Sequence, residues 1–191
     1  MSLPSSFEGT AYRLTDLWQR IIPINKSVPL KYLEIGAFYG ANVISFANNY
    51  AKHRDSELHV IDPWIDYEQY PEYKGQQDSI FSTFQKNIVS SGHEEKVRIH
   101  RGFSNEELLK LPDDYFDVIY IDGNHEPEFV LEDGVLAFRK LKKGGYMIFD
   151  DYGWGGADLT QKGIDAFVSG YHKRIRFITI YECQLYLMKT S

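Results

Sequence analysis

The sequence has only one cysteine, Cys183, among its 191 residues. No internal disulfide can form, and this cysteine usage fits a reducing compartment, so we expect a cytoplasmic location. The sequence also lacks any apolar run approaching about 20 residues, and its first ten residues lack the basic and hydrophobic regions of a signal peptide. We therefore expect a soluble protein that has no membrane partner.

An excess of positive charge is also absent, since the formal net charge is −6. This balance argues against a surface that follows the phosphates of nucleic acid. The densest basic cluster, residues 139–143, lies at the expected end of a helix, where cations offset the helix dipole. The sequence shows no repeats or linkers. We expect a single domain over residues 1–191, with residues 1–29 as an N-terminal helical extension.

Strand-like and helix-like segments alternate along the chain. We expect strands at residues 30–35, 58–62, 96–100, 116–121 and 146–149, and helices at 10–22, 41–52, 77–90, 105–110, 127–141 and 161–169. Gly144 and Gly145 are expected to end the helix at 127–141. Residues 174–189 alternate strongly around a break near Glu182, as two adjacent antiparallel strands do. The pattern predicts an α/β fold with a mostly parallel sheet, an antiparallel C-terminal edge and helices on both faces.

The run from Glu34 to Gly40, Glu-Ile-Gly-Ala-Phe-Tyr-Gly, is the most informative stretch. An apolar strand ends in a carboxylate, and two glycines four residues apart then precede an amphipathic helix. Such a turn lets the polar end of a ligand approach bare backbone N–H groups at the helix N-terminus. Asp62 closes the next apolar run, 26 residues after Gly36. In a doubly wound sheet a carboxylate there meets the hydroxyls of a ligand ribose, so the spacing predicts a nucleoside-type cofactor.

Three acidic residues follow the fourth and fifth expected strands: Asp122, Asp150 and Asp151. If these strands are neighbours, two of the charges lie ~4 Å apart and repel by about 4 kcal/mol at an effective dielectric constant near 20. A hard divalent cation such as Mg²⁺ relieves that repulsion; otherwise one carboxyl is driven neutral. The alternative is that Asp150 and Asp151 cap a loop or bind backbone amides. His125 fits a general base, a metal ligand or a residue at the start of the next helix.

These motifs resemble those of class I S-adenosylmethionine-dependent methyltransferases. The resemblance covers about residues 30–170 and includes the turn at 102–104, the run at 120–125 and the run at 144–151. It is closest to the small metal-dependent O-methyltransferase branch, which includes catechol O-methyltransferase and the macrolide and sugar O-methyltransferases. It implies a single-domain Rossmann-like fold with a mostly parallel seven-stranded sheet and an antiparallel C-terminal edge.

The resemblance also implies roles for individual residues. Residues 36–40 would cradle the methionine end of the cofactor, and Asn42 would bind its carboxylate. Asp62 would bind the ribose, and Phe103 and Ser104 would border the adenine. The implied cofactor-binding residues are Glu34, Gly36, Ala37, Phe38, Tyr39, Gly40, Asn42, Asp62, Trp64, Gly102, Phe103, Ser104 and Asp122. The implied metal ligands are Asp122, Asp150 and Asp151, and the implied catalytic residues are His125 and Asp122.

Two positions depart from the wider pattern. Phe38 stands where a middle glycine is common, and Asp151 stands where catechol-type enzymes carry Asn, whereas sugar-type enzymes carry a second Asp. The expected function is therefore Mg²⁺-dependent O-methylation of a small diol, phenol or sugar. For this function, we expect the aromatic stretch at 64–73 and the loop at 152–156 to form the walls of the acceptor pocket. The alternative for both segments is ordinary packing or contact in a homodimer. The leading helix is another surface that could form the contact in a homodimer.

Three other functions stay open at this point. A metal-independent N- or O-methyltransferase would keep the cofactor without the metal. A non-catalytic module would bind the cofactor and act through protein partners. A dinucleotide dehydrogenase would need a G-x-G-x-x-G turn for its pyrophosphate, and the Phe at position 38 argues against it.

Overall fold

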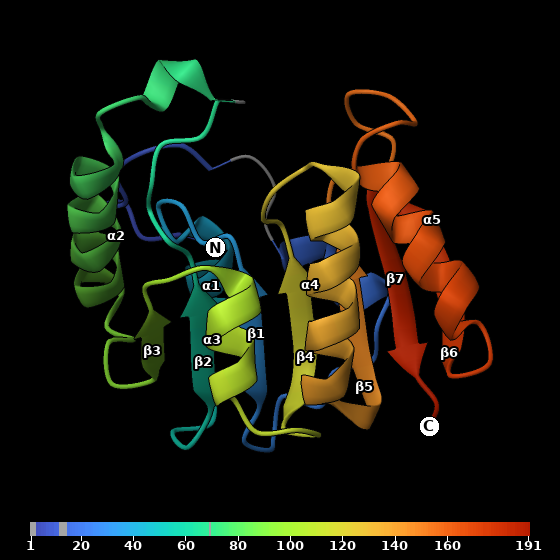
Figure 1. Cartoon of the computed structure of the whole chain (residues 1–191). Coiled ribbons are helices and arrows are strands. Elements are labelled where there is room, and N and C mark those ends of the chain that lie inside the picture. The colour runs from blue at the N-terminus through green and yellow to red at the C-terminus, as the bar shows by residue number, and fades with distance from the viewer. Residues whose placement is uncertain (1–2, 12–14, 69) are drawn as a thin grey trace.

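The computed structural model describes residues 3–11, 15–68 and 70–191. Seven strands form one sheet in the order β3-β2-β1-β4-β5-β7-β6 (Figure 1). Neighbouring strands from β3 to β5 are parallel, whereas β7 is antiparallel to both β5 and β6. The strands are β1 (Lys31–Ile35), β2 (Glu57–Ile61), β3 (Val97–His100), β4 (Phe116–Ile121), β5 (Leu141–Phe149), β6 (Ile175–Tyr181) and β7 (Gln184–Lys189).

Helices cover both faces of the sheet (Figure 1). Successive residues of a strand point to opposite faces, so Tyr32 and Leu33 of β1 belong to two different cores. The core around Tyr32 contains residues of η1 (Thr15–Arg20), α1 (Ala41–Asn49) and α2 (Gln77–Ser91). The core around Leu33 contains residues of α3 (Ser104–Lys110), α4 (Pro127–Lys140) and α5 (Thr160–Tyr171). A short helix, η2 (Pro71–Tyr73), lies between β2 and α2.

This architecture confirms the predicted fold, and the bounds of β4 agree with the sequence pattern. The helix expected over residues 10–22 differs, because the structure has a short 3-10 helix at Thr15–Arg20 and residues 12–14 lie outside the described part. The backbone N–H of Thr15 donates to Ser45 Oγ at 3.1 Å. The Trp18 indole, 1% exposed, donates to Gln184 Oε1 at 3.0 Å, so side-chain contacts with α1 and β7 hold this segment.

The expectation that Gly144 and Gly145 end a helix is wrong. Helix α4 ends at Lys140, and β5 begins at the next residue, Leu141. Gly144 has φ +81°, and a Cβ on Gly145 would lie 3.0 Å from the carbonyl oxygen of Asp117. The two glycines therefore allow β5 to shift register against β4 within the strand.

The strand order determines where a ligand can bind. The order reverses at β1, which pairs with β2 on one side and with β4 on the other. In open parallel sheets, ligands bind beyond the carboxyl ends of the strands at this reversal. In the described part of the chain, no helix has both the length and the hydropathy needed to cross a membrane.

Candidate functional site

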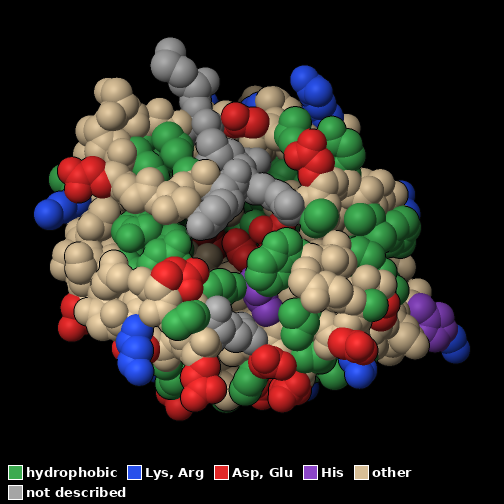
Figure 2. All heavy atoms as spheres, turned by 90° about the horizontal axis from the view of Figure 1, so that it is seen from above, with side chains coloured by type: hydrophobic (Ala, Val, Ile, Leu, Met, Phe, Trp, Pro, Cys, Tyr) green, Lys and Arg blue, Asp and Glu red, His purple; other side chains and the backbone are tan. Residues whose placement is uncertain are grey.

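A cavity of about 920 Å³ opens at the carboxyl ends of the parallel strands. Figure 2 shows this face, with acidic side chains in a central hollow, a histidine beside them and hydrophobic side chains around the rim. Ligand pockets typically span about 300–1,000 Å³, so this cavity is large enough for a cofactor and a second small molecule. Its walls come from the turn after β1, the ends of β2, β4 and β5, and the segment between β2 and α2.

The glycine turn after β1 lies directly against the end of β4. Gly36 has φ +84°, and a Cβ there would be 1.8 Å from the carbonyl oxygen of Asp122. The backbone N–H of Asp122 donates to the Ile35 carbonyl at 2.9 Å. Only glycine allows this approach, which brings the turn and Asp122 to the same wall of the cavity.

The carboxylate of Asp62 holds the glycine turn. Its Oδ2 accepts the backbone N–H groups of Ala37 and Phe38 at 2.9 and 3.0 Å, and its Oδ1 accepts that of Trp64 at 2.7 Å. Burial raises the pKa of Asp62, while these backbone donors lower it. Asp62 also lines the cavity, so its role at a ribose stays a prediction beside this structural role. Sequence spacing placed the residue correctly but did not reveal the three backbone donors.

Two further polar side chains of this turn region have buried oxygen atoms. Glu34 is 1% exposed and accepts the Tyr32 hydroxyl at 2.9 Å. Burial is the main cause that raises its pKa to about 8, and the charge of Asp62 acts in the same direction. Asn42, in the first turn of α1, lines the cavity, and its buried Oδ1 has no hydrogen-bond partner among the described residues.

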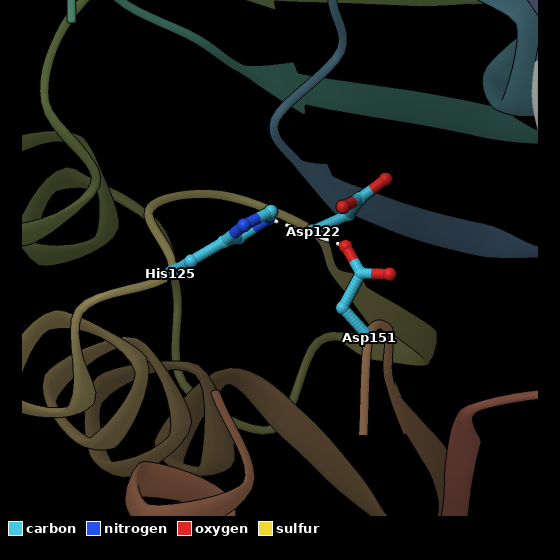
Figure 3. A group of neighbouring side chains, drawn as sticks. All are labelled: Asp122, His125 and Asp151. Carbon is cyan, nitrogen blue, oxygen red and sulfur yellow. Dashed lines mark ion pairs between the residues drawn. The ribbon is translucent and has the colours of Figure 1, made fainter. Parts of the chain in front are cut away.

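The acidic group lies on the adjoining wall. One atom each of Asp122, His125 and Asp151 lie within 4.8 Å of one another (Figure 3). His125 Nε2 is 3.2 Å from Asp151 Oδ2. Asp151 has φ +56°, a conformation that costs free energy in a residue other than glycine. The Thr160 hydroxyl, which donates to the Asp151 carbonyl at 2.5 Å, helps to hold this strained residue.

The Tyr120 hydroxyl lies between Asp150 and Asp122. This buried hydroxyl donates to Asp150 Oδ2 at 2.8 Å and lies 3.3 Å from Asp122 Oδ2. Burial raises the pKa of Asp122 well above its usual range, and the charges of Asp150 and Asp151 raise it further. Burial and the charge of Asp151 likewise raise the pKa of Asp150. The three acidic residues expected at the ends of β4 and β5 therefore lie within electrostatic reach of one another.

His125 is 7% exposed and is surrounded by aromatic side chains. The Tyr70 hydroxyl is 3.0 Å from its Nδ1, and the Trp154 ring lies edge-on with its centroid 5.3 Å from that of His125. Tyr70 and Trp154 both line the cavity. The two segments expected to form the acceptor wall each contribute at least one aromatic side chain to it.

Trp64 is an exception to the expected wall. Its side chain is 2% exposed, packs on Phe81 and Phe84, and donates to the Phe38 carbonyl at 3.0 Å. It supports the glycine turn from the core and is not among the residues that line the cavity. Gly40 and Gly102 are not among them either. The other predicted residues that do line the cavity are Glu34, Gly36, Ala37, Phe38, Tyr39, Asn42, Asp62, Phe103, Ser104, Asp122, His125, Asp150 and Asp151.

Several residues of the lining were not predicted from the sequence, among them Phe129 and Asp133 of α4. Asp133 is 3% exposed, and burial raises its pKa to about 7. It lies at helical spacing from the buried residues Val130 and Ala137. An acidic residue on the apolar face of a helix was the signal that could have identified it.

A model of the methyltransferase domain family matches residues 33–152, more than half of the chain. The chain belongs to this family. The match includes the glycine turn, Asp62 and the acidic group, and it confirms the family that the motifs resemble. This methyltransferase domain is 30% identical over 129 residues to the uncharacterized protein R132 of Acanthamoeba polyphaga mimivirus. The match covers 64% of this chain and 52% of that protein, so the chain spans about half the length of this relative.

Solved structures show the same fold. The O-methyltransferase TomG from Streptomyces achromogenes, in complex with SAM, superposes with a TM-score of 0.66 at 22% identity over 84% of this chain and 73% of TomG. The MycE methyltransferase from the mycinamycin biosynthetic pathway, in complex with Mg and SAH, superposes with a TM-score of 0.58 at 16% identity. That superposition covers 86% of this chain and 46% of MycE. The methyltransferase domain therefore has the Rossmann-like fold of class I S-adenosylmethionine-dependent methyltransferases.

Proposed function

We propose that this domain transfers a methyl group from S-adenosylmethionine to a hydroxyl oxygen of a small diol, phenol or sugar, assisted by Mg²⁺ or a similar divalent cation. The observation that carries the proposal is the convergence of Asp122, His125 and Asp151 on the wall of the cavity that also contains the glycine turn. Two solved relatives support it, since TomG was solved with SAM and MycE with Mg and SAH.

The charge of the cavity fits cationic ligands. Nine acidic residues line it, of which Glu34, with a pKa of about 8, is neutral near pH 7, and none of the described lining residues is Lys or Arg. A wall of one charge sign concentrates ligands of the opposite sign. The sulfonium and ammonium groups of S-adenosylmethionine and a divalent cation have that sign. The unpartnered Oδ1 of Asn42 also fits a hydrogen-bond-donating ligand group at the start of α1.

Asp122, Asp150 and Asp151 would hold the cation, because carboxylate oxygens are the ligands that Mg²⁺ prefers. When bound, the cation supplies Lewis acidity that lowers the pKa of the acceptor hydroxyl. The Tyr120 hydroxyl fixes Asp150 and lies within 3.3 Å of Asp122, so it keeps both carboxylates in one orientation. A hydrogen bond from a residue that does not itself bind the metal commonly orients the residues that do.

His125 is the proposed base for the acceptor hydroxyl. Asp151, whose Oδ2 is 3.2 Å from His125 Nε2, orients the ring. A general base must lie about 2.6–3.2 Å from the group that loses the proton. The Tyr70 side chain is a phenol, and its hydroxyl lies within this range, 3.0 Å from His125 Nδ1. The geometry beside His125 thus suits a phenol or another hydroxyl, and Tyr70 and Trp154 shield the reacting group from water.

The test measures release of S-adenosylhomocysteine from S-adenosylmethionine with panels of catechols, phenols and sugar diols. We expect turnover with Mg²⁺, loss of turnover in EDTA, and recovery when Mg²⁺ is added in excess. Asp150→Ala is expected to abolish Mg²⁺-dependent turnover while calorimetry shows nearly unchanged binding of S-adenosylhomocysteine. Asp158→Ala, a matched change in the exposed loop before α5, serves as the control.

Two outcomes would contradict parts of this proposal. Turnover that survives exhaustive chelation would indicate a metal-independent methyltransferase. Tight binding of S-adenosylhomocysteine without turnover on any panel would indicate a non-catalytic module.

A further inference from the structure

A buried amide on α2 joins the glycine turn to the segment at residues 3–11. Asn87 is 1% exposed, and its Nδ2 donates to the Tyr39 carbonyl at 2.9 Å. The same Nδ2 donates to the Glu8 carbonyl at 2.8 Å, and Oδ1 accepts the Glu8 backbone N–H at 3.0 Å. Both N–H donors and the oxygen of this amide therefore bind backbone groups that are distant in the sequence.

The segment at residues 3–11 also packs directly on the turn. Gly9 has φ +97°, and a Cβ there would lie 2.5–2.7 Å from three carbon atoms of the Tyr39 ring. Phe7 packs against the core that contains residues of α1 and α2, and Thr10 lines the cavity. The segment therefore extends along the turn from this core to the wall of the cavity.

The turn depends on such support, because its backbone is strained at Phe38. Phe38 has φ +47°, a conformation that persists in a residue other than glycine only where the surrounding contacts fix it. Asp62 accepts the Phe38 N–H at 3.0 Å, and the Trp64 indole donates to the Phe38 carbonyl at 3.0 Å. Asn87 holds the next carbonyl, that of Tyr39. Phe38 and Tyr39 both line the cavity, so the conformation of the turn determines the shape of this wall.

We propose that Asn87 is a positioning residue through which cofactor binding and the seating of residues 3–11 stabilise each other. Seated means that Glu8 is bonded to Asn87 and that Gly9 lies against the Tyr39 ring. A ligand that binds the strained turn must, by linkage, also favour the seated segment, because Asn87 and Tyr39 join the two. This inference rests on the proposed function, since it concerns the turn that is proposed to hold S-adenosylmethionine.

Hydrogen exchange followed by mass spectrometry tests this linkage in the parent protein. S-adenosylhomocysteine is expected to slow exchange of the backbone amides of residues 3–11, because the segment then opens less often. The amides of β6, at the edge of the sheet, serve as the control and are expected to exchange at an unchanged rate. A residue with a purely structural role would not produce protection that depends on the ligand.

Gly9→Ala tests the linkage from the side of the segment. The added Cβ would overlap the Tyr39 ring, so it displaces the segment while Asn87 and the turn keep their own side chains. If the seated fraction falls to about one tenth, the calorimetric Kd for S-adenosylhomocysteine rises about 10-fold. Gly92→Ala is the matched control, since Gly92 has φ +71° at the end of α2 and a Cβ there meets no described atom within 4 Å. This control adds comparable backbone strain and is expected to keep the parent Kd.

A double-mutant cycle separates coupling from two independent effects. Asn87→Ala is expected to raise the Kd for S-adenosylhomocysteine about 10-fold, as loss of a buried hydrogen bond typically does. Gly9→Ala and Asn87→Ala together are expected to bind about as weakly as either change alone, because both release the same segment. Fully additive losses would overturn the coupling. If circular dichroism shows that Asn87→Ala is unfolded, hydrogen exchange in the parent and the Kd of Gly9→Ala still decide the question.

The outcomes distinguish this inference from the proposed function. A parent protein that does not bind S-adenosylhomocysteine refutes the cofactor assignment and this inference with it. Binding without protection of residues 3–11 overturns the inference alone, and so does an unchanged Kd in Gly9→Ala. In both of these cases the proposed methyl transfer stands.

Discussion

Replacing Glu34 by glutamine is expected to remove a large part of the pH dependence of stability. Glu34 is 1% exposed, and burial raises its pKa to about 8 although the Tyr32 hydroxyl donates to it. In the unfolded chain a glutamate titrates near 4.3. Between these two values the folded protein binds the proton and the unfolded chain does not. The stability that this group contributes is therefore complete at low pH and is lost as the pH rises towards 8.

The size of the effect follows from the interval between the two titrations. From pH 5.5 to the folded pKa near 8, each pH unit lowers the free energy of unfolding by about 1.36 kcal/mol. The total loss from Glu34 is about 3 kcal/mol. Glutamine is close in shape to the protonated carboxyl group, can accept the Tyr32 hydroxyl and does not titrate. Between pH 5.5 and pH 8.5, the free energy of unfolding of Glu34→Gln should therefore rise by about 3 kcal/mol relative to that of the parent.

Urea denaturation followed by circular dichroism, in EDTA at pH 5.5, 7.0 and 8.5, measures this difference. Other buried carboxyl groups are present in both proteins, so their contributions largely cancel in the comparison. Glu94→Gln, at an exposed position, is the control and should follow the parent at every pH. If Glu34→Gln and the parent lose stability in parallel, Glu34 is not protonated in the folded protein and the reasoning from its burial is refuted.

Three other substitutions test the site. Asp62→Ala should weaken binding of S-adenosylhomocysteine with little effect on Mg²⁺ affinity, and equal calorimetric affinity in variant and parent would refute the ribose assignment. His125→Ala should depress turnover most near neutral pH, and an unaltered pH–rate profile would make His125 a structural residue. Tyr120→Phe removes the hydroxyl that donates to Asp150, so Mg²⁺ affinity should fall about 10- to 100-fold while the affinity for S-adenosylhomocysteine stays unchanged. An unchanged Mg²⁺ affinity would show that Tyr120 does not position the carboxylates.

The elements of the fold were predictable where a short stretch of sequence determines them. The strand Phe116–Ile121 is nearly all apolar and was found with its observed bounds, because burial on both faces leaves a continuous apolar run. The strand β5 was found only in part. Its start depends on a register shift against β4, and a pair of glycines read along the sequence alone looks like the end of a helix. Pairing between strands is a long-range property that local patterns do not encode.

The candidate site was predictable to the extent that topology alone determines it. Residues that follow parallel strands must gather at one edge of the sheet, and Asp122 and Asp151 do so. Side-chain direction was not predictable in the same way. Trp64 follows β2 as expected, but its indole turns into the core, because a large aromatic ring is more stable packed on other rings than facing an aqueous cavity. Asp133 escaped notice because it lies within a helix rather than at a strand end.

The burial of these carboxyl groups also bears on what the cavity binds. Burial raises the pKa of Glu34, Asp122, Asp133 and Asp150, so each of them costs the folded protein stability near neutral pH. Apolar or amide side chains in the same places would pack without that cost. A purely structural role therefore does not account for four such groups in one cavity. Cationic and hydrogen-bond-donating ligands reverse the cost, because they favour the ionised carboxylates, and this links the electrostatics of the fold directly to the proposed cofactor and metal.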